Sequence, residues 1–317
     1  MFSDNFEAWA DGIFVAVLIV CGIAWALLLR HRVRSRLPLL EPEPRIAPFW
    51  TLAEFFVCFG MFIICIAASQ RVGRGWMSPE TVERLEAGTF EPSMQTSQDM
   101  LVLIVSSTVA SMLAMLSVMV WMNLTSVREL KRFGLWLSLN DLKLGSKAAF
   151  LVLPPVLLLS TVINSWVTYK HSVIDTLGAN PTLAVLFGIA FSTVLLTPIF
   201  EEFTFRVLLQ GGAEQLSRRV QATGTLQRQS EAPEWEVIPA SEVATWSWWP
   251  VVMASGTFAA LHIGQGAAPV PLFFLSLALG YIYRQTGRIG PCIVVHAILN
   301  AFTVSLTMLK LWLDQTP

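Results

Sequence analysis

Long apolar segments separated by short polar stretches fill most of this 317-residue chain. About eight of them are long enough, whole or with help from tilt and flanking residues, to cross roughly 30 Å of hydrocarbon as helices. The sixth and seventh are short and bounded by glycine and proline. The pattern therefore predicts an all-α fold, a polytopic membrane helix bundle with about eight transmembrane helices, near residues 12–29, 49–69, 100–122, 148–168, 183–210, 248–262, 272–284 and 289–313.

The composition agrees with a membrane protein. Hydrophobic residues make up 54% of the chain, charged residues 14%, and the mean hydropathy is +0.60. Soluble domains carry about 25% charged residues. A net charge of −1 argues against a nucleic-acid partner. The four cysteines lie in apolar segments without a CxxC or Cys/His ligand spacing, so neither a disulfide framework nor a cysteine zinc site is expected.

The charges between the apolar segments predict how the chain crosses the bilayer. Basic residues follow the first, third, fifth and seventh segments, whereas the stretch 70–99 is net acidic. By the positive-inside rule, the basic loops lie in the cytoplasm and both termini lie on the opposite side. The residues before the first apolar segment are acidic, so we expect this segment to be retained as a helix rather than cleaved as a signal peptide.

Two parts of the chain are expected. Residues 1–147 would hold N-terminal transmembrane helices and an amphipathic interfacial helix at 128–147, where Leu, Phe and Trp are mixed with Lys and Arg. Residues 148–317 would hold a core interrupted at 221–247 by a polar cytoplasmic insert, which resembles a variable or partly disordered loop. The sequence has no internal repeat, so a transporter built from inverted halves is not supported.

Three ionisable residues, Glu201, Glu202 and Arg206, end the fifth apolar segment. A carboxylate at membrane depth costs at least roughly 2.5–3.5 kcal/mol, so it needs a partner, a proton or a wet cavity. Glu202 and Arg206 are four residues apart and share a helical face, so we expect them to pair. Glu201 is turned about 100° away and stays free for chemistry. Alternatively, all three lie at the membrane surface and contact water there.

Three further polar residues lie on the last apolar segments: His262, His296 and Asn300. A single buried histidine is more often a packing residue, but two histidines, an amide and a carboxylate pair form a rarer set. Such a set suits peptide-bond hydrolysis, because a carboxylate and a histidine deprotonate water and a histidine and an asparagine donate to the oxyanion. Glu201, His262 and His296 would alternatively bind zinc.

These residues resemble the motifs of the CAAX protease and bacteriocin-processing enzyme family of intramembrane proteases, which includes type 2 CAAX prenyl endopeptidases. The family carries EExxxR, FxxxH and HxxxN on successive membrane helices. The chain has them as Glu201 and Glu202 with Arg206, Phe258 with His262, and His296 with Asn300. The resemblance covers about residues 148–307. It departs at Val207, where many members have glycine, and at the long insert 221–247.

The resemblance implies an intramembrane endopeptidase acting on a membrane-associated protein or peptide. Glu201 and His262 would activate water, His296 and Asn300 would line the oxyanion site, and Glu202 and Arg206 would support them. We expect an integral, multi-pass protein in the lipid bilayer of a bacterial inner membrane, with the active site opening toward the cytoplasm. The alternative is a non-proteolytic scaffold or bacteriocin-immunity-type protein with the same fold. Whether the substrate is prenylated is not encoded in these motifs.

Overall fold

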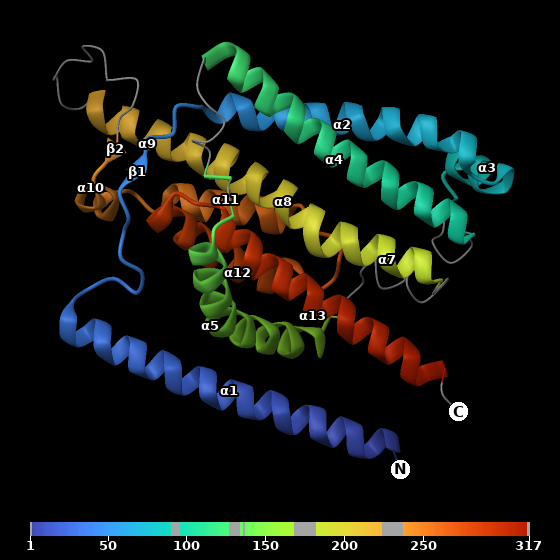
Figure 1. Cartoon of the computed structure of the whole chain (residues 1–317), viewed down its shortest axis with the longest axis horizontal. Coiled ribbons are helices and arrows are strands. Elements are labelled where there is room, and N and C mark those ends of the chain that lie inside the picture. Colours follow the sequence, from blue (N-terminus) through green and yellow to red (C-terminus); the bar gives the residue numbers. More distant parts are fainter. Residues whose placement is uncertain are drawn as a thin grey trace.

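The protein is described by a computed structural model that covers residues 2–89, 96–126, 134–135, 137–167, 182–223 and 237–315. Most of these residues lie in helices, which pack into one elongated bundle (Figure 1). The strands of the described part are one antiparallel pair of two residues each. The all-α helix bundle expected from the apolar pattern is thus confirmed.

The elements follow one another along the chain without a repeat in the described part. The first part contains α1 (Phe2–Ser35), β1 (Arg45–Ile46), α2 (Leu52–Gly73), η1 (Arg74–Trp76), α3 (Pro79–Ala87), α4 (Ser97–Ser126) and α5 (Leu139–Asn164). The second part contains α7 (Leu183–Phe191), η4 (Ser192–Leu196), α8 (Thr197–Glu202), η5 (Phe203–Gly211), α9 (Gly212–Thr223), β2 (Val237–Ile238), α10 (Ala240–Thr245), α11 (Trp249–Ala260), α12 (Pro269–Thr286) and α13 (Gly290–Gln315).

Six helical segments of the described chain are long and apolar enough to cross a membrane. They lie at Val15–Ser35, Leu52–Trp76, Ser97–Leu124, Leu139–Asn164, Leu183–Val220 and Gly290–Leu309. The expected count of eight is not confirmed. Helices α11 and α12 do form where the sixth and seventh segments were expected, but α11 has only 12 residues. At 1.5 Å per residue, a helix of that length spans roughly 18 Å.

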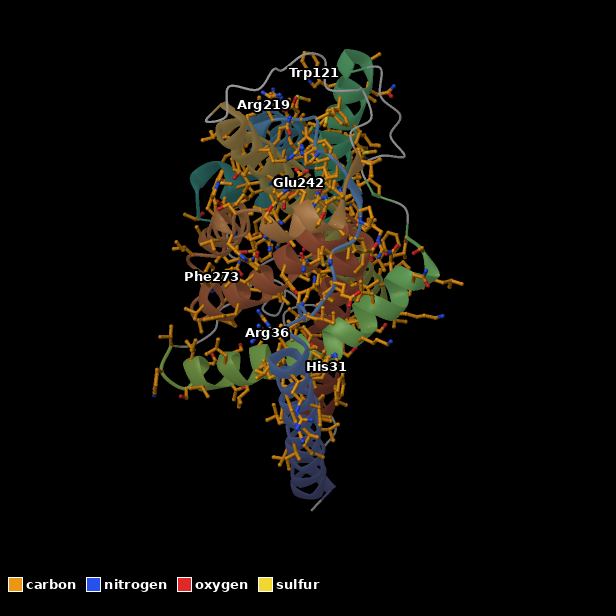
Figure 2. All side chains as sticks on the ribbon, turned by 90° about the vertical axis from the view of Figure 1, so that its left-hand side faces the viewer. His31, Arg36, Trp121, Arg219, Glu242 and Phe273 are labelled. Carbon is orange, nitrogen blue, oxygen red and sulfur yellow. The ribbon has the colours of Figure 1, made fainter. Side chains whose placement is uncertain are left out.

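Both termini lie at one end of the bundle, and β1, β2, α9 and α10 lie at the other (Figure 1). Figure 2 views this second end, where His31, Arg36 and Arg219 are labelled. The termini therefore share one side of the molecule, as the charge pattern predicted. The same pattern assigns the end with β1 and β2 to the cytoplasm, and that assignment stays a prediction.

The interfacial helix expected at 128–147 falls partly outside the described residues, which omit 127–133 and 136. Residues from Leu139 onward form the first turns of α5, which continues to Asn164. The helix begins there because two reciprocal hydrogen bonds cap it. The Ser138 side chain accepts a hydrogen bond from the backbone N–H of Asp141, and the Asp141 carboxylate accepts one from the backbone N–H of Ser138. The second half of the expected interfacial helix is therefore continuous with the next transmembrane segment.

Helix α5 bends part-way along its length (Figure 1), and Pro154 and Pro155 lie inside it. Pro155 has no N–H, so the Leu151 carbonyl loses its helical partner. The indole Nε1–H of Trp25 donates to this carbonyl at 2.9 Å, and the Cys21 thiol approaches it at 3.5 Å. Helix α1 is thus attached to the bundle at a carbonyl that a proline left free.

The polar insert contains ordered structure in its second half. Residues 224–236 lie outside the described part, but β2 pairs with β1, placing Arg45 opposite Ile238. Ile238, Val243 and Trp246 are buried together and pack against Ala47. The expectation of a loop over 221–247 is therefore wrong for 237–245, because three apolar side chains in this polar stretch form a small core with the segment before α2.

Helices α5 and α13 approach closely at Gly145. A Cβ atom on Gly145 would lie 2.5 Å from Val294 Cβ and 2.8 Å from the Pro291 carbonyl oxygen. Only glycine allows this contact, because carbon atoms in van der Waals contact are separated by about 3.5–4.0 Å. The close approach places α13, which carries His296 and Asn300, directly against α5.

We expect Gly145→Ala to destabilise the protein by about 1–3 kcal/mol, because the added methyl group overpacks the contact between α5 and α13. The measurement is thermal unfolding in detergent. Gly256→Ala in α11 is the matched control, since a Cβ atom there meets nothing within 4 Å. Equal unfolding temperatures for the two variants would contradict this packing argument.

Candidate active site

The two glutamates lie in a helix that is α-helical only over a short stretch. Residues of η4 and η5 adopt π-helical hydrogen bonding on either side of α8, which ends at Glu202. A π segment widens the helix and frequently marks a functional site. The apolar pattern predicts a regular helix here and contains no signal for the two π segments.

Glu202 is fully buried and makes two charged contacts. Its Oε2 accepts from Arg206 Nε at 2.9 Å, and its Oε1 lies 2.9 Å from His296 Nδ1. Both side chains of the Glu202–Arg206 pair have no exposed surface. The pairing predicted from their four-residue spacing is therefore confirmed. Both charges are compensated by partners, which a buried ion needs in a low-dielectric interior.

Arg206 is held from a second helix. Its Nη2 donates to Ser276 Oγ of α12 at 2.7 Å, and its guanidinium carbon lies 6.0 Å from the centroid of the Phe258 ring. Ser276 is fully buried. Ser276 has no signal in the sequence, because a serine in an apolar segment does not reveal its partner.

His296 lies between the two glutamates. Its Nδ1 faces Glu202, and its Nε2 lies 3.6 Å from Glu201 Oε2. The glutamate side chains differ in exposure, with 22% of Glu201 exposed and none of Glu202. Glu201 is therefore the carboxylate that reaches water, whereas Glu202 orients the imidazole.

His262 lies in the turn just after α11, not within the helix as expected. Its Nδ1 lies 2.8 Å from the Phe258 carbonyl oxygen. This bond requires a proton on Nδ1, so the neutral ring presents Nε2 as an acceptor. The Phe258 ring lies 4.8 Å from the His262 ring and 6.1 Å from the His296 ring, measured between centroids. Phe258 is thus a buried packing residue next to both histidines.

Asn300 bonds to the π segment η4. Its Nδ2 donates to the Thr193 carbonyl oxygen at 2.8 Å. The last π bond of η4 runs from the Thr197 N–H to Ser192. The next hydrogen bond with the same five-residue spacing would run from the N–H of residue 198 to the Thr193 carbonyl, but residue 198 is a proline and has no N–H. Asn300 therefore donates to the carbonyl that Pro198 leaves without a donor. The second N–H of the Asn300 side-chain amide remains for another partner.

These side chains surround one cavity of about 530 Å³. Glu201, His262, His296 and Asn300 all line it, together with residues of α5, α12 and α13. Glu202 and Arg206 do not line it and lie behind His296. Gln265, Thr193 and Thr197 also line the cavity. The motifs do not include these three, so sequence reasoning missed them.

Val207 occupies the position where the motif often has glycine. Its side chain is fully buried, and its carbonyl accepts from Trp50 Nε1 at 2.6 Å. The close approach to the segment before α2 falls instead at Gly211 and Gly212, where a Cβ atom would lie 2.8 Å from Trp50 Nε1 and 2.7 Å from the Thr51 carbonyl oxygen. The bulk of Val207 therefore does not displace this contact.

A zinc site was the alternative for Glu201, His262 and His296. Among the described residues, no group of three or more His, Cys, Asp or Glu side chains is placed to hold a metal ion. Zinc in catalytic sites takes three protein ligands. Zinc binding by Glu201, His262 and His296 stays a prediction.

Comparison with known families gives one match. Residues 181–302 match the family model described as type II CAAX prenyl endopeptidase Rce1-like. This segment belongs to the Rce1-like family. It contains all seven motif residues and confirms the resemblance drawn from them. The match supports a CAAX-type endopeptidase embedded in a membrane. No curated protein and no solved structure matches the chain.

In this Rce1-like segment, we expect Arg206→Met to destabilise the protein by about 3–5 kcal/mol, because it leaves the buried Glu202 carboxylate without its main counter-charge. The double variant Glu202→Gln/Arg206→Met should lose less, since no unpaired buried charge remains. Thermal unfolding of both proteins in detergent makes the comparison. A double variant less stable than Arg206→Met would contradict the pairing as the source of the effect.

Proposed function

We propose that this protein is an intramembrane endopeptidase that hydrolyses a peptide bond in a membrane-associated protein or peptide. The observation that carries the proposal is the convergence of Glu201, His262, His296 and Asn300 on one cavity. These residues come from three separate helical regions of the Rce1-like segment. A cavity of about 530 Å³ is within the range of roughly 300–1,000 Å³ typical of ligand sites.

In this proposal Glu201 and His262 activate the water. The Glu201 carboxylate is partly exposed and lines the cavity, so it accepts a proton from a water molecule there. His262 is fixed by donating its Nδ1–H to the Phe258 carbonyl. Its Nε2 accepts a hydrogen bond from the same water and orients it. The water attacks the peptide carbonyl, and Glu201 returns the proton to the departing amine.

His296 and Asn300 hold the oxyanion in this proposal. As an imidazolium, His296 donates Nδ1–H to Glu202 and directs Nε2–H into the cavity, next to Glu201. Asn300 keeps one N–H free after its bond to Thr193. Both donors are fixed before the substrate arrives, which is what makes an oxyanion site effective. Glu202 and Arg206 support this geometry by orienting His296.

The proposed orientation follows from the charge pattern. The end of the bundle with β1, β2, α9 and α10 carries basic residues and would face the cytoplasm. The substrate would enter the cavity from the membrane, since α5, α12 and α13 line it with apolar residues such as Leu157, Leu272 and Phe302. The proposed location is a bacterial inner membrane.

We expect Glu201→Gln to lower the rate of cleavage by about 10²–10⁴-fold, because it removes the general base while keeping the shape of the side chain. Cleavage is measured by comparing membrane-peptide termini in cells that express the wild type or the variant. Glu80→Gln is the control, since Glu80 forms only an exposed ion pair on α3. Peptide termini that are identical in wild-type and Glu201→Gln cells would favour the scaffold alternative.

We also expect a strong zinc chelator to leave the rate of cleavage unchanged, because the base in this proposal is a carboxylate and not a metal-bound water. The metal content of the purified protein is measured alongside. Stoichiometric zinc that is lost together with activity, and restored with it, would show a metal-dependent mechanism instead.

A further inference from the structure

Polar residues continue along the helix beyond the proposed active site at a spacing of four. Glu202, Arg206, Gln210 and Glu214 are all buried, with at most 2% of each residue exposed. Arg45, on β1, is also buried at 6%. Burying five polar or charged side chains costs free energy unless each finds partners. The catalytic proposal uses only the first two, so the other three need a separate explanation.

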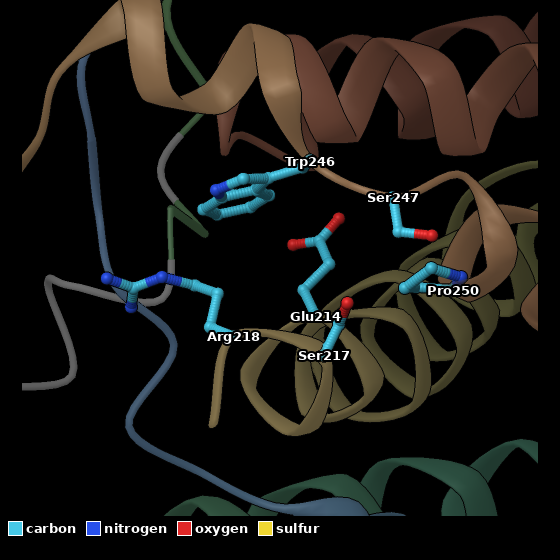
Figure 3. A pocket seen from close by; sticks show the side chains of 6 residues that line it. All are labelled: Glu214, Ser217, Arg218, Trp246, Ser247 and Pro250. Atoms are coloured by element: carbon cyan, nitrogen blue, oxygen red, sulfur yellow. The ribbon is translucent and has the colours of Figure 1, made fainter. Parts of the chain in front are cut away.

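Gln210, Glu214 and Arg45 form the outer half of this set, and their side chains contact one another in a row. Gln210 Nε2 donates to Glu214 Oε1 at 3.0 Å and to the Gly280 carbonyl oxygen at 2.9 Å. Arg45 Nη1 lies 3.2 Å from Glu214 Oε2 and donates to the carbonyls of Tyr283 and Arg284. Figure 3 shows the Glu214 carboxylate projecting from α9 into the space beside Trp246 and Ser247.

The inner half of the set consists of Glu202 and Arg206, and it meets the outer half next to Gly280 of α12. A Cβ atom on Gly280 would lie 2.9 Å from Gln210 Oε1 and 3.4 Å from Arg206 Nη1. Both atoms are buried without a hydrogen-bond partner. Gln210 donates to the Gly280 carbonyl oxygen and Arg206 donates to Ser276 Oγ, so both side chains are held by α12 at positions one turn apart. Gln210 and Arg206 are thus connected through α12, at the point where Gly280 allows both side chains to approach this helix.

We propose that Glu214, held by Arg45, is a positioning residue for the proposed protease site. It acts through Gln210 and Arg206 on Glu202, and through Glu202 on the orientation of His296. This inference rests on the proposed function, because it assigns the chain of contacts a role in the same reaction. Glu214 does not line the catalytic cavity, so it acts only through these intermediates.

Arg45 belongs to a segment that crosses the end of α12. Within this segment the Glu43 N–H donates to the Gln285 carbonyl at 2.8 Å, and the Glu43 carboxylate pairs with Arg288 at 2.6 Å. Glu43 therefore anchors the same segment as Arg45. Its side chain, however, is 44% exposed and pairs with Arg288, not with Glu214 or Gln210. It provides a control for loss of the anchor alone.

The test compares Glu214→Gln, Arg45→Met and their double variant with Glu43→Gln in the full-length protein. We expect kcat to fall by about two- to thirty-fold in each single variant, the range that positions along a coupling network show. KM should stay unchanged, because the contact is made away from the substrate. The double variant should be no slower than either single one, since both interrupt the same chain.

Two conservative variants sharpen the comparison. Arg45→Lys keeps a positive charge next to Glu214 and should recover part of kcat, although lysine lacks the planar guanidinium that lies over the Trp246 and Tyr283 rings. Gly280→Ala places a methyl group close to Gln210 Oε1 and Arg206 Nη1, and also to Val251 Cγ1, without changing any charge. It should lower kcat like Glu214→Gln, and it keeps the test decisive if Glu214→Gln fails to fold.

A spectroscopic measurement separates this inference from the proposed function. In protein with ¹⁵N-labelled histidine, the His296 Nδ1 proton, bonded to Glu202, is assigned with His296→Gln. Its resonance should shift in Glu214→Gln and Gly280→Ala but not in Glu43→Gln, whether or not cleavage is detected. Absence of cleavage by the wild type would count against the proposed function alone. An unchanged resonance and kcat in Glu214→Gln, or an equal loss in Glu43→Gln, would overturn the positioning role.

Discussion

The buried contact of Glu202 with both Arg206 and His296 is the constraint on which the rest of the site depends. Three ionisable side chains share a region without solvent, where an unpaired charge would cost several kcal/mol. Their partners come from α8, η5, α12 and α13, so these elements must be held at fixed distances. The contact therefore both requires a rigid bundle and sets which nitrogen of His296 faces Glu201 and the cavity.

Carbonyls left free by proline are used to attach helices to each other. Pro155 leaves the Leu151 carbonyl without a helical donor, and this carbonyl accepts a hydrogen bond from Trp25 of α1. Pro198 does the same for the Thr193 carbonyl, which accepts from Asn300 of α13. A free carbonyl in a membrane segment must find a donor, so each proline creates a specific point of contact. In the second case the donor is a proposed catalytic residue. The break in the helix and the placement of Asn300 are thus one feature.

The N-terminal part of the chain takes part in the core that the motifs define. The segment before α2 pairs with β2, carries Arg45 to Glu214, and places Trp50 against the carbonyl of Val207. The family match begins only at residue 181 and ends at 302. The packing of the matched segment is therefore completed by residues from outside it. The division of the chain into two parts at residue 147 stays a prediction.

The sequence by itself determined features that depend on spacing along one helix. The apolar segments predicted the bundle, the four-residue interval predicted the Glu202–Arg206 pair, and the motifs singled out five of the residues that line the cavity. Only the tertiary structure decided that His296 bonds to Glu202, that Ser276 holds Arg206, that α11 stops before His262, and that 237–245 is ordered. Helical periodicity fixes neighbours within a turn, whereas these partners lie far apart in the chain. They meet because packing, glycine contacts and free carbonyls select one arrangement of the helices.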